Sequence, residues 1–293
     1  MKTASLPANR ATRRYNAFGQ YMKDLFGQAV YKVNVDAGFT CPNRDGTVSV
    51  GGCIYCNNDS FRPSACTSTA SVRDQIETGI PYLRRRYGAE KFIVYFQPFT
   101  NTYAPVGTLE RLYREALEQP GVVGLAIGTR PDCVDEEKIT LLEELAMDRF
   151  ILVEYGLQSI HDRTLKFINR GHDYACFKRA LAMTAGRGIK IGAHLILGFP
   201  TETRDDMLAM ADELSGLPLG FRSFTSFRSS GTRLLRTCMR PSRLPRWAMR
   251  NISRWLPISS SSSRRTSCSS VCSPRRRMIF SSRRSGTNHG ASS

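Results

Sequence analysis

The sequence predicts an α/β fold in which short buried strands alternate with amphipathic helices and curl into part of a barrel. Between residues 30 and 220, short apolar runs alternate with longer stretches whose apolar residues recur at helical spacing. Repeated βα units of this kind form either an open parallel sheet or a barrel. No GxGxxG motif follows any apolar run, so the sequence gives no support to a dinucleotide-binding open sheet. We therefore expect a barrel.

The predicted strands are short apolar runs bounded by turn-forming or charged residues. This pattern is typical of strands that are buried on both faces of a parallel sheet. The five runs are residues 30–35, 92–96, 122–127, 150–155 and 189–197.

The predicted helices lie between these strands. Val72, Ile76, Ile80 and Leu83 recur at three- and four-residue spacing, which places them on one helix face. Pro131 is followed by several acidic residues, as expected near the positive N-terminal end of a helix. The predicted helices are residues 71–86, 109–117 and 136–147.

Polar or reactive residues follow each predicted strand. In barrels of this type, catalytic residues lie on the loops after the carboxyl ends of the strands. We therefore expect one shared site. Its candidate residues, in strand order, are Cys41, Gln97, Thr129, Gln158 and Pro200.

The cysteines after the first strand have the spacing C-x11-C-x2-C, formed by Cys41, Cys53 and Cys56. Three thiolates leave one iron of a four-iron cluster without a protein ligand, which is typical of a catalytic metal centre. The alternative is a structural zinc site with Cys66 as the fourth ligand. The spacing permits both, although a zinc ribbon does not require the βα units that follow.

Charge divides the chain into two unlike parts. The formal net charge is +17, yet residues 1–220 hold 26 of the 42 basic residues and all 25 acidic ones, so this part of the chain is nearly neutral.

The sequence shows no export signal and no run of about 18 apolar residues that could span a membrane. We therefore expect a cytoplasmic protein in which residues 1–29 form an N-terminal extension and residues 30–220 form the barrel core.

Residues 221–293 have the composition of a disordered tail, with 16 Arg, 20 Ser and no acidic residue. Codons can be chosen for residues 221–231 so that one restored base gives Phe-Leu-Lys-Leu-His-Gln-Leu-Gln-Val-Val-Arg, a string that resembles the sixth strand of a known family of βα barrels. We therefore expect this tail to be the product of a shifted reading frame. The last strand of a six-stranded barrel is then expected to be missing.

An ordered series of motifs runs through the predicted barrel. The motifs are FTCPNRDG at 39–46, GGCIYC at 51–56, YFQPFTNTY at 95–103, GTRPD at 128–132, VEYGLQS at 153–159, NRGH at 169–172 and AHLILGFPTE at 193–202. This series resembles the YhcC-type branch of the radical S-adenosylmethionine (SAM) superfamily, which is related to the catalytic subunit of Elongator. The resemblance covers about residues 14–220.

The resemblance implies a partial (β/α)6 radical SAM barrel and an enzyme of unknown substrate. Cys41, Cys53 and Cys56 would hold a [4Fe–4S] cluster, and SAM would bind its fourth iron. Reductive cleavage of SAM would give a 5′-deoxyadenosyl radical. A flavodoxin- or ferredoxin-type protein would supply the electron.

The resemblance also implies a set of SAM-binding residues. Tyr55 would lie against the adenine, and Gly198 and Pro200 would form an adenine-side turn. Gln97 and Asn101 would lie near the methionine amine. The region of the ribose and methionine carboxylate would include Glu154, Gln158 and Ser159.

Some of these residues have structural alternatives. Glu154 in a strand can be an ion-pair partner, and Arg130 can pair with Asp132. His172 and His194 can be hydrogen-bonded structural histidines.

Two other functions stay open at this point. The relationship to Elongator suggests an RNA-modifying radical enzyme, although a near-neutral barrel offers no basic surface for phosphates. The second alternative is a non-enzymatic, zinc-stapled RNA-binding protein that uses its Arg/Ser tail.

Overall fold

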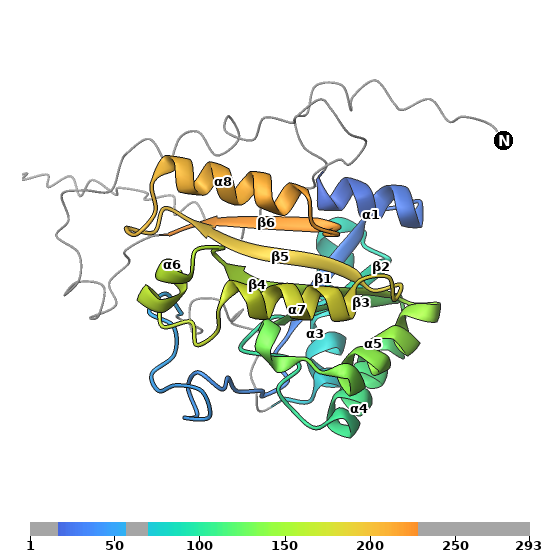
Figure 1. Cartoon of the computed structure of the whole chain (residues 1–293). Coiled ribbons are helices and arrows are strands. Elements are labelled where there is room, and N and C mark those ends of the chain that lie inside the picture. Colours follow the sequence, from blue (N-terminus) through green and yellow to red (C-terminus); the bar gives the residue numbers. More distant parts are fainter. Residues whose placement is uncertain (1–16, 57–69, 228–293) are drawn as a thin grey trace, which may run out of the picture.

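The computed structural model describes residues 17–56 and 70–227. Its centre is a six-stranded parallel sheet in which the strands follow one another in chain order, β1 to β6. The sheet curls into a half-barrel (Figure 1). The strands are β1 (Val30–Val35), β2 (Lys91–Phe96), β3 (Val122–Thr129), β4 (Phe150–Gln158), β5 (Lys190–Leu197) and β6 (Phe221–Ser226).

The helices between the strands cover the convex face of the sheet, and their apolar sides form the main core with the strands. Ser71 and Asp74 form a capping box at the start of α3, which satisfies backbone N–H groups at that end. The elements are α3 (Val72–Tyr87), α4 (Val106–Leu117), the short 3-10 helix η2 (Pro131–Cys133), α5 (Glu136–Asp148), α6 (Asp162–Phe167), α7 (Tyr174–Thr184) and α8 (Arg204–Ser215).

The concave face has a smaller core of its own at the amino ends of the strands. Helix α1 (Phe18–Phe26) packs there, with Met22 fully buried against the inward side chains of β2, β3 and β4. The Phe18 and Tyr21 rings contact Phe221 of β6 at centroid distances of 5.2 and 5.1 Å. Helix α1 therefore closes the end of the half-barrel opposite the carboxyl ends of the strands.

The structure confirms the five predicted strands, and most of their bounds differ from the prediction by a few residues. The expectation that the sixth strand is missing is wrong. Strand β6 pairs in parallel with β5, from Phe221 opposite Gly192 to Ser226 opposite Leu197. Strand pairing uses backbone groups, so an unusual side-chain composition does not prevent it. The rest of the predicted tail, residues 228–293, lies outside the described residues.

Across residues 17–56 and 70–227, no helix has the length and apolar character that crossing a membrane requires.

Candidate active site

The loop after β1 brings the three candidate cysteines to the carboxyl ends of the strands. Its backbone is tightly folded: the N–H of Arg44 donates to the Cys41 carbonyl at 2.8 Å, and the N–H of Gly52 donates to the Asn43 carbonyl at 2.8 Å. The N–H of Cys56 donates to the Cys53 carbonyl at 2.9 Å, which closes the C-x2-C turn.

The three cysteines are free thiols that influence one another electrostatically. Cys53 is buried, whereas Cys41 and Cys56 are partly exposed. Burial raises the pKa of the Cys56 thiol and the nearby Cys53 and Cys41 raise it further, while the Arg44 guanidinium opposes the shift. Among the described residues, no three His, Cys, Asp or Glu side chains converge on the position of a single metal ion. A four-iron cluster binds each cysteine through a different iron, so its ligands need not converge on one point.

A segment after α6 holds the cysteine loop in place. The Asn169 side chain donates to the Gly52 carbonyl at 2.9 Å and accepts from the Ser49 hydroxyl at 3.2 Å. The N–H of Ile54 donates to the Ile168 carbonyl at 3.1 Å. Asn169 has a left-handed backbone conformation with φ of 52°. Asn169 belongs to the NRGH motif at 169–172, but no spacing rule connects it to the cysteines, so the sequence predicted no role for it.

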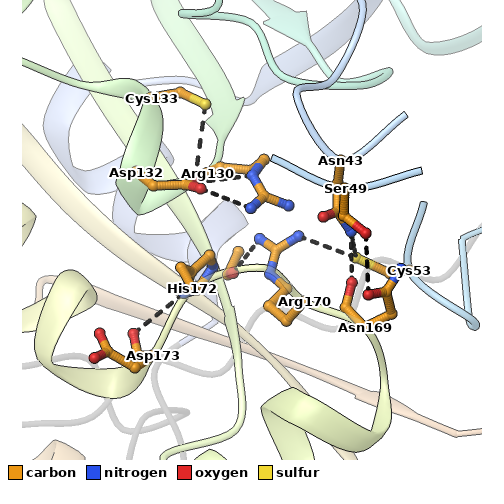
Figure 2. Close-up of polar contacts among 11 residues, drawn as sticks. Asn43, Ser49, Cys53, Arg130, Asp132, Cys133, Asn169, Arg170, His172 and Asp173 are labelled. Atoms are coloured by element: carbon orange, nitrogen blue, oxygen red, sulfur yellow. Dashed lines mark hydrogen bonds and ion pairs between the residues drawn. The ribbon is translucent and has the colours of Figure 1, made fainter. Parts of the chain in front are cut away.

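The Cys53 sulfur accepts hydrogen bonds from two side chains (Figure 2). Asn43 Nδ2 lies 3.4 Å from it and Arg170 Nη1 lies 3.6 Å from it. The second guanidinium nitrogen of Arg170 donates to the Gly156 carbonyl at 2.5 Å. The sequence did not predict that Asn43 and Arg170 donate hydrogen bonds to Cys53.

Arg130 forms the predicted pair with Asp132, with contacts of 2.8 and 2.7 Å. His172 lies beside this pair and near Arg170 (Figure 2). Burial lowers the pKa of His172 to about 3, and the Arg170 charge contributes. The imidazole is therefore neutral at neutral pH, in agreement with a structural role.

The polar residues after β2 are tied to the sheet. The buried Asn101 side chain donates to the carbonyls of Phe96 and Gly128 at 3.0 and 2.8 Å, which joins the ends of β2 and β3. Its Oδ1 atom is buried and has no hydrogen-bond partner within residues 17–56 and 70–227. Gln97 accepts a hydrogen bond from Asn34 at 3.1 Å. A role for either residue toward SAM stays a prediction.

Glu154 lies inside the half-barrel, within strand β4 rather than at its carboxyl end. It forms an ion pair with Lys32 at 3.4 Å and accepts hydrogen bonds from Tyr95 at 2.7 Å and His194 at 3.2 Å. These contacts favour the ion-pair alternative for Glu154, and its role toward SAM stays a prediction. His194 is hydrogen-bonded, as the structural alternative expects.

Gln158 and Ser159 stand at the carboxyl end of β4. Gln158 has a φ of 71° at a register shift between β4 and β5, which turns the chain away from the sheet. The Ser159 hydroxyl donates to Glu202 Oε1 at 2.5 Å and accepts from the His161 N–H at 3.0 Å. Burial raises the pKa of Glu202, while hydrogen bonds from the Ser159 and Thr164 side chains oppose the shift.

Tyr55 and the turn after β5 come together, as the predicted adenine site requires. The Tyr55 ring lies 6.4 Å from the Phe199 ring, which is the central residue between Gly198 and Pro200. Ile54 and Tyr55 pack against a small core that includes Phe199, Ile196 and Phe227. An apolar surface of this kind suits the face of a purine ring.

The surroundings of Cys53 fit an anionic, thiolate-bound group. Arg170 is buried and has no hydrogen-bonded carboxylate in the described part of the chain. The Asp132 charge acts on both Arg130 and Arg170, so two buried guanidinium groups share one carboxylate, which is unfavourable. Two buried guanidinium nitrogens without a hydrogen-bond partner among the described residues add to this excess of donors: Arg130 Nη1 and Arg170 Nε. Negative charge at the cysteines would complete the charge balance.

Comparison with known families decides the family. The model of the Radical SAM superfamily matches residues 41–214, which is more than half of the chain. The chain belongs to the radical SAM superfamily. Members of this superfamily are enzymes, and the predicted resemblance to it is confirmed.

Curated relatives place this radical SAM chain in the YhcC-type branch. YtqA of Bacillus subtilis is 36% identical over 217 residues, which cover 74% of this chain and 67% of YtqA. YhcC of Escherichia coli K12 is 41% identical over 194 residues, which cover 66% of this chain and 62% of YhcC. The chain therefore spans roughly two thirds of the length of these relatives.

A solved structure agrees with the fold of this radical SAM chain. Elp3 of the archaeon Methanocaldococcus infernus, with an N-terminal deletion, matches with a TM-score of 0.54 at 20% identity. The match covers 71% of this chain and 48% of the Elp3 chain. The predicted partial radical SAM barrel is thus confirmed.

Proposed function

We propose that this protein cleaves SAM reductively and uses the resulting radical on a substrate whose identity is not fixed by the site. In this proposal Cys41, Cys53 and Cys56 hold a [4Fe–4S] cluster. When bound, the cluster supplies the electron that splits the SAM sulfonium into methionine and a 5′-deoxyadenosyl radical.

One observation carries the proposal. The buried Cys53 sulfur accepts hydrogen bonds from Asn43 and Arg170, and Arg170 has no carboxylate hydrogen-bonded to it among the described residues. Hydrogen-bond donors to a sulfur and a buried positive charge complement the negative charge of a metal-bound thiolate. These contacts around Cys53 therefore suit a cysteine that is a metal ligand.

The other residues of the site would bind and orient SAM. Tyr55 and the Gly198–Pro200 turn would hold the adenine between apolar surfaces. The Ser159–Glu202 pair offers a hydroxyl and a carboxylate oxygen at the end of β4. Gln97 and Asn101 would contribute amide oxygens on the β2 side. These groups would position the sulfonium and exclude water from the radical.

The electron requires an external donor. We propose a flavodoxin- or ferredoxin-type protein as this partner. RNA is one possible substrate class, but none of the contacts described above is specific to a nucleic acid.

Metal content and product formation test the proposal. Anaerobically purified or reconstituted protein is expected to be brown and to contain about four iron and four sulfide per chain. Dithionite and SAM are then expected to release 5′-deoxyadenosine. Cys53→Ala is expected to abolish both the cluster and this product.

Cys133→Ala is the matched control, because Cys133 is also a buried free thiol near Arg130 and Asp132. This variant should keep the cluster and the cleavage. A colourless wild-type protein with one zinc per chain after reconstitution would show the zinc alternative to be correct. Equal loss of iron in both variants would show that the ligands are misassigned.

A further inference from the structure

We propose that Arg170 and Asn43 set the reduction potential of the cluster through the sulfur of Cys53. This inference rests on the proposed function, because it requires the cluster that Cys53 would hold. Both are positioning residues: they contact a ligand of the cluster and take no part in the chemistry of SAM.

The two donors reach the same sulfur from different elements. Asn43 belongs to the cysteine loop itself, and Arg170 follows α6, 117 residues after Cys53. Their nitrogens lie 3.4 and 3.6 Å from Cys53 Sγ (Figure 2). Cys53 is only 7% exposed, so water competes little for these hydrogen bonds.

Each donor is fixed by a second hydrogen bond. Asn43 Nδ2 also donates to the Asn169 carbonyl at 2.5 Å, and Arg170 Nη2 donates to the Gly156 carbonyl at 2.5 Å. The close approach leaves no room for larger residues beside them. A Cβ atom on Gly171, which has a φ of 78°, would lie 2.6 Å from Asn43 Oδ1, and one on Gly156 would lie 2.8 Å from Arg170 Nη2. The Asn43 and Arg170 side chains are therefore already oriented toward the Cys53 sulfur by the surrounding structure.

The charge distribution gives these contacts an electrochemical consequence. Asp132 forms two hydrogen bonds with Arg130, and its single negative charge acts on both Arg130 and Arg170. Arg170 has only a sulfur and a carbonyl as hydrogen-bond partners among the described residues. One-electron reduction adds a negative charge to the cluster and forms no new bond. The Arg170 charge and the two N–H donors stabilise this reduced form and raise the potential.

A merely structural role would have a different outcome. If Arg170 and Asn43 only held the loop, their replacement would lower cluster occupancy without changing the potential of the clusters that remain. The midpoint potential of the loaded fraction separates these two cases. Cluster occupancy is measured independently as iron and sulfide per chain.

The experiment is an anaerobic redox titration of the reconstituted full chain without SAM, followed by the electron paramagnetic resonance signal of the reduced cluster. The variants are Arg170→Gln, Arg170→Lys and Asn43→Ala. Arg163→Gln is the matched control, because Arg163 is an exposed arginine of α6 that pairs with Asp206 at 2.6 Å and makes no contact with the cysteines.

In Arg170→Gln we expect the ratio of reduced to oxidised cluster at a fixed potential to fall about ten-fold, which is about 59 mV for a one-electron couple. Arg170→Lys keeps the charge and should lie between this variant and the wild type. The midpoint potential of Asn43→Ala should fall by a smaller amount, and that of Arg163→Gln should match the wild type. If Arg170→Gln binds no iron, the midpoint potentials of Arg170→Lys and Asn43→Ala test the inference instead.

Unchanged midpoints in all loaded variants would overturn the inference, as would an equal shift in Arg163→Gln. These results leave the proposed function intact, since the wild type would still bind the cluster and cleave SAM. A wild-type protein that binds no cluster would overturn the proposed function instead.

Discussion

Lys32 and Glu154 form an ion pair across the inside of the half-barrel, with Nζ and Oε1 3.4 Å apart. Lys32 belongs to β1 and Glu154 to β4, and strands β2 and β3 lie between them in the sheet. The pair therefore spans the curvature of the sheet. Burial alone would raise the pKa of Glu154, but the Lys32 charge and the hydrogen bonds from His194 and Tyr95 hold it well below its ordinary value.

We expect Glu154→Gln to lower the free energy of unfolding at pH 7 by about 3 kcal/mol, at the lower end of the range for breaking a buried pair. The lower end applies because the Lys32 side chain remains 25% exposed. Urea unfolding followed by circular dichroism measures this change. Glu110→Gln is the matched control, since Glu110 pairs with Arg114 on the surface, and it should cost less than about 1 kcal/mol. Equal costs would contradict a bracing role for Glu154.

The same pair predicts a pH dependence. Because the pKa of Glu154 is depressed in the folded protein, its stabilisation is present above the ordinary carboxyl pKa of about 4.3 and is lost as the pH falls below it. The difference in unfolding free energy between wild type and Glu154→Gln should therefore be constant from about pH 7 to about pH 5.5 and should shrink at lower pH. A difference that grows as the pH falls would show that folding raises the pKa of Glu154 rather than lowering it.

The sequence predicted the five strands well because each is a short apolar run with clear ends. The sixth strand was missed for a physical reason. Amino-acid composition describes only the side chains, and the composition of residues 221–293 is that of a disordered segment. Strand β6 forms through backbone pairing with β5, and Phe221 packs on α1 from its inward face. Neither contact has a signal in the local sequence.

The cysteines of the site could be predicted from spacing, but the groups around them could not. Asn169 and Arg170 contact the cysteine loop from more than 110 positions away in the chain. Only the folded barrel brings the segment after α6 next to the loop after β1. For Glu154, the position in a family motif predicted a role in SAM binding. The contacts of its side chain are with Lys32, Tyr95 and His194.

Asn169 is expected to hold the cysteine loop closed. Asn169→Asp removes the donor to the Gly52 carbonyl and keeps an acceptor for Ser49. It should therefore speed amide hydrogen exchange in residues 49–54 by about ten-fold or more, which corresponds to the loss of about 1.4 kcal/mol of local stability. Hydrogen–deuterium exchange with mass spectrometry checks this. Exchange that stays at the wild-type rate would show that the other hydrogen bonds of the loop, such as that between Ile54 and Ile168, hold it without the Asn169 side chain.

Arg222 occupies a position where the fold favours an apolar residue. It is 6% exposed, and its guanidinium donates only to the Leu214 and Leu219 carbonyls within the described part of the chain. Burial lowers the pKa of Arg222. We expect Arg222→Leu to raise the unfolding free energy by about 1–3 kcal/mol, because it removes a poorly paired buried charge.

The control for this change is Arg111→Leu, because the Arg111 side chain is 66% exposed. Its effect should stay within about 0.5 kcal/mol. Thermal and urea unfolding of the two variants and the wild type compare them directly. Destabilisation by Arg222→Leu would mean that the two carbonyl contacts outweigh the cost of burying the charge.

Arg222 also bears on the prediction that a shifted reading frame begins near residue 221. Restoring one base gives a strand with leucine at position 222 and lysine at position 223. Position 222 faces the helix-side core beside Leu214, and position 221, which faces α1, remains phenylalanine in both frames. The restored frame thus places an apolar side chain where the present one buries a guanidinium. Sequencing the DNA across codons 219–231 checks this, and the expected result is one base missing within that stretch. An early stop in the next frame, with no acidic and apolar-patterned continuation, would show instead that the 16 arginines and 20 serines of residues 221–293 are a genuine basic extension.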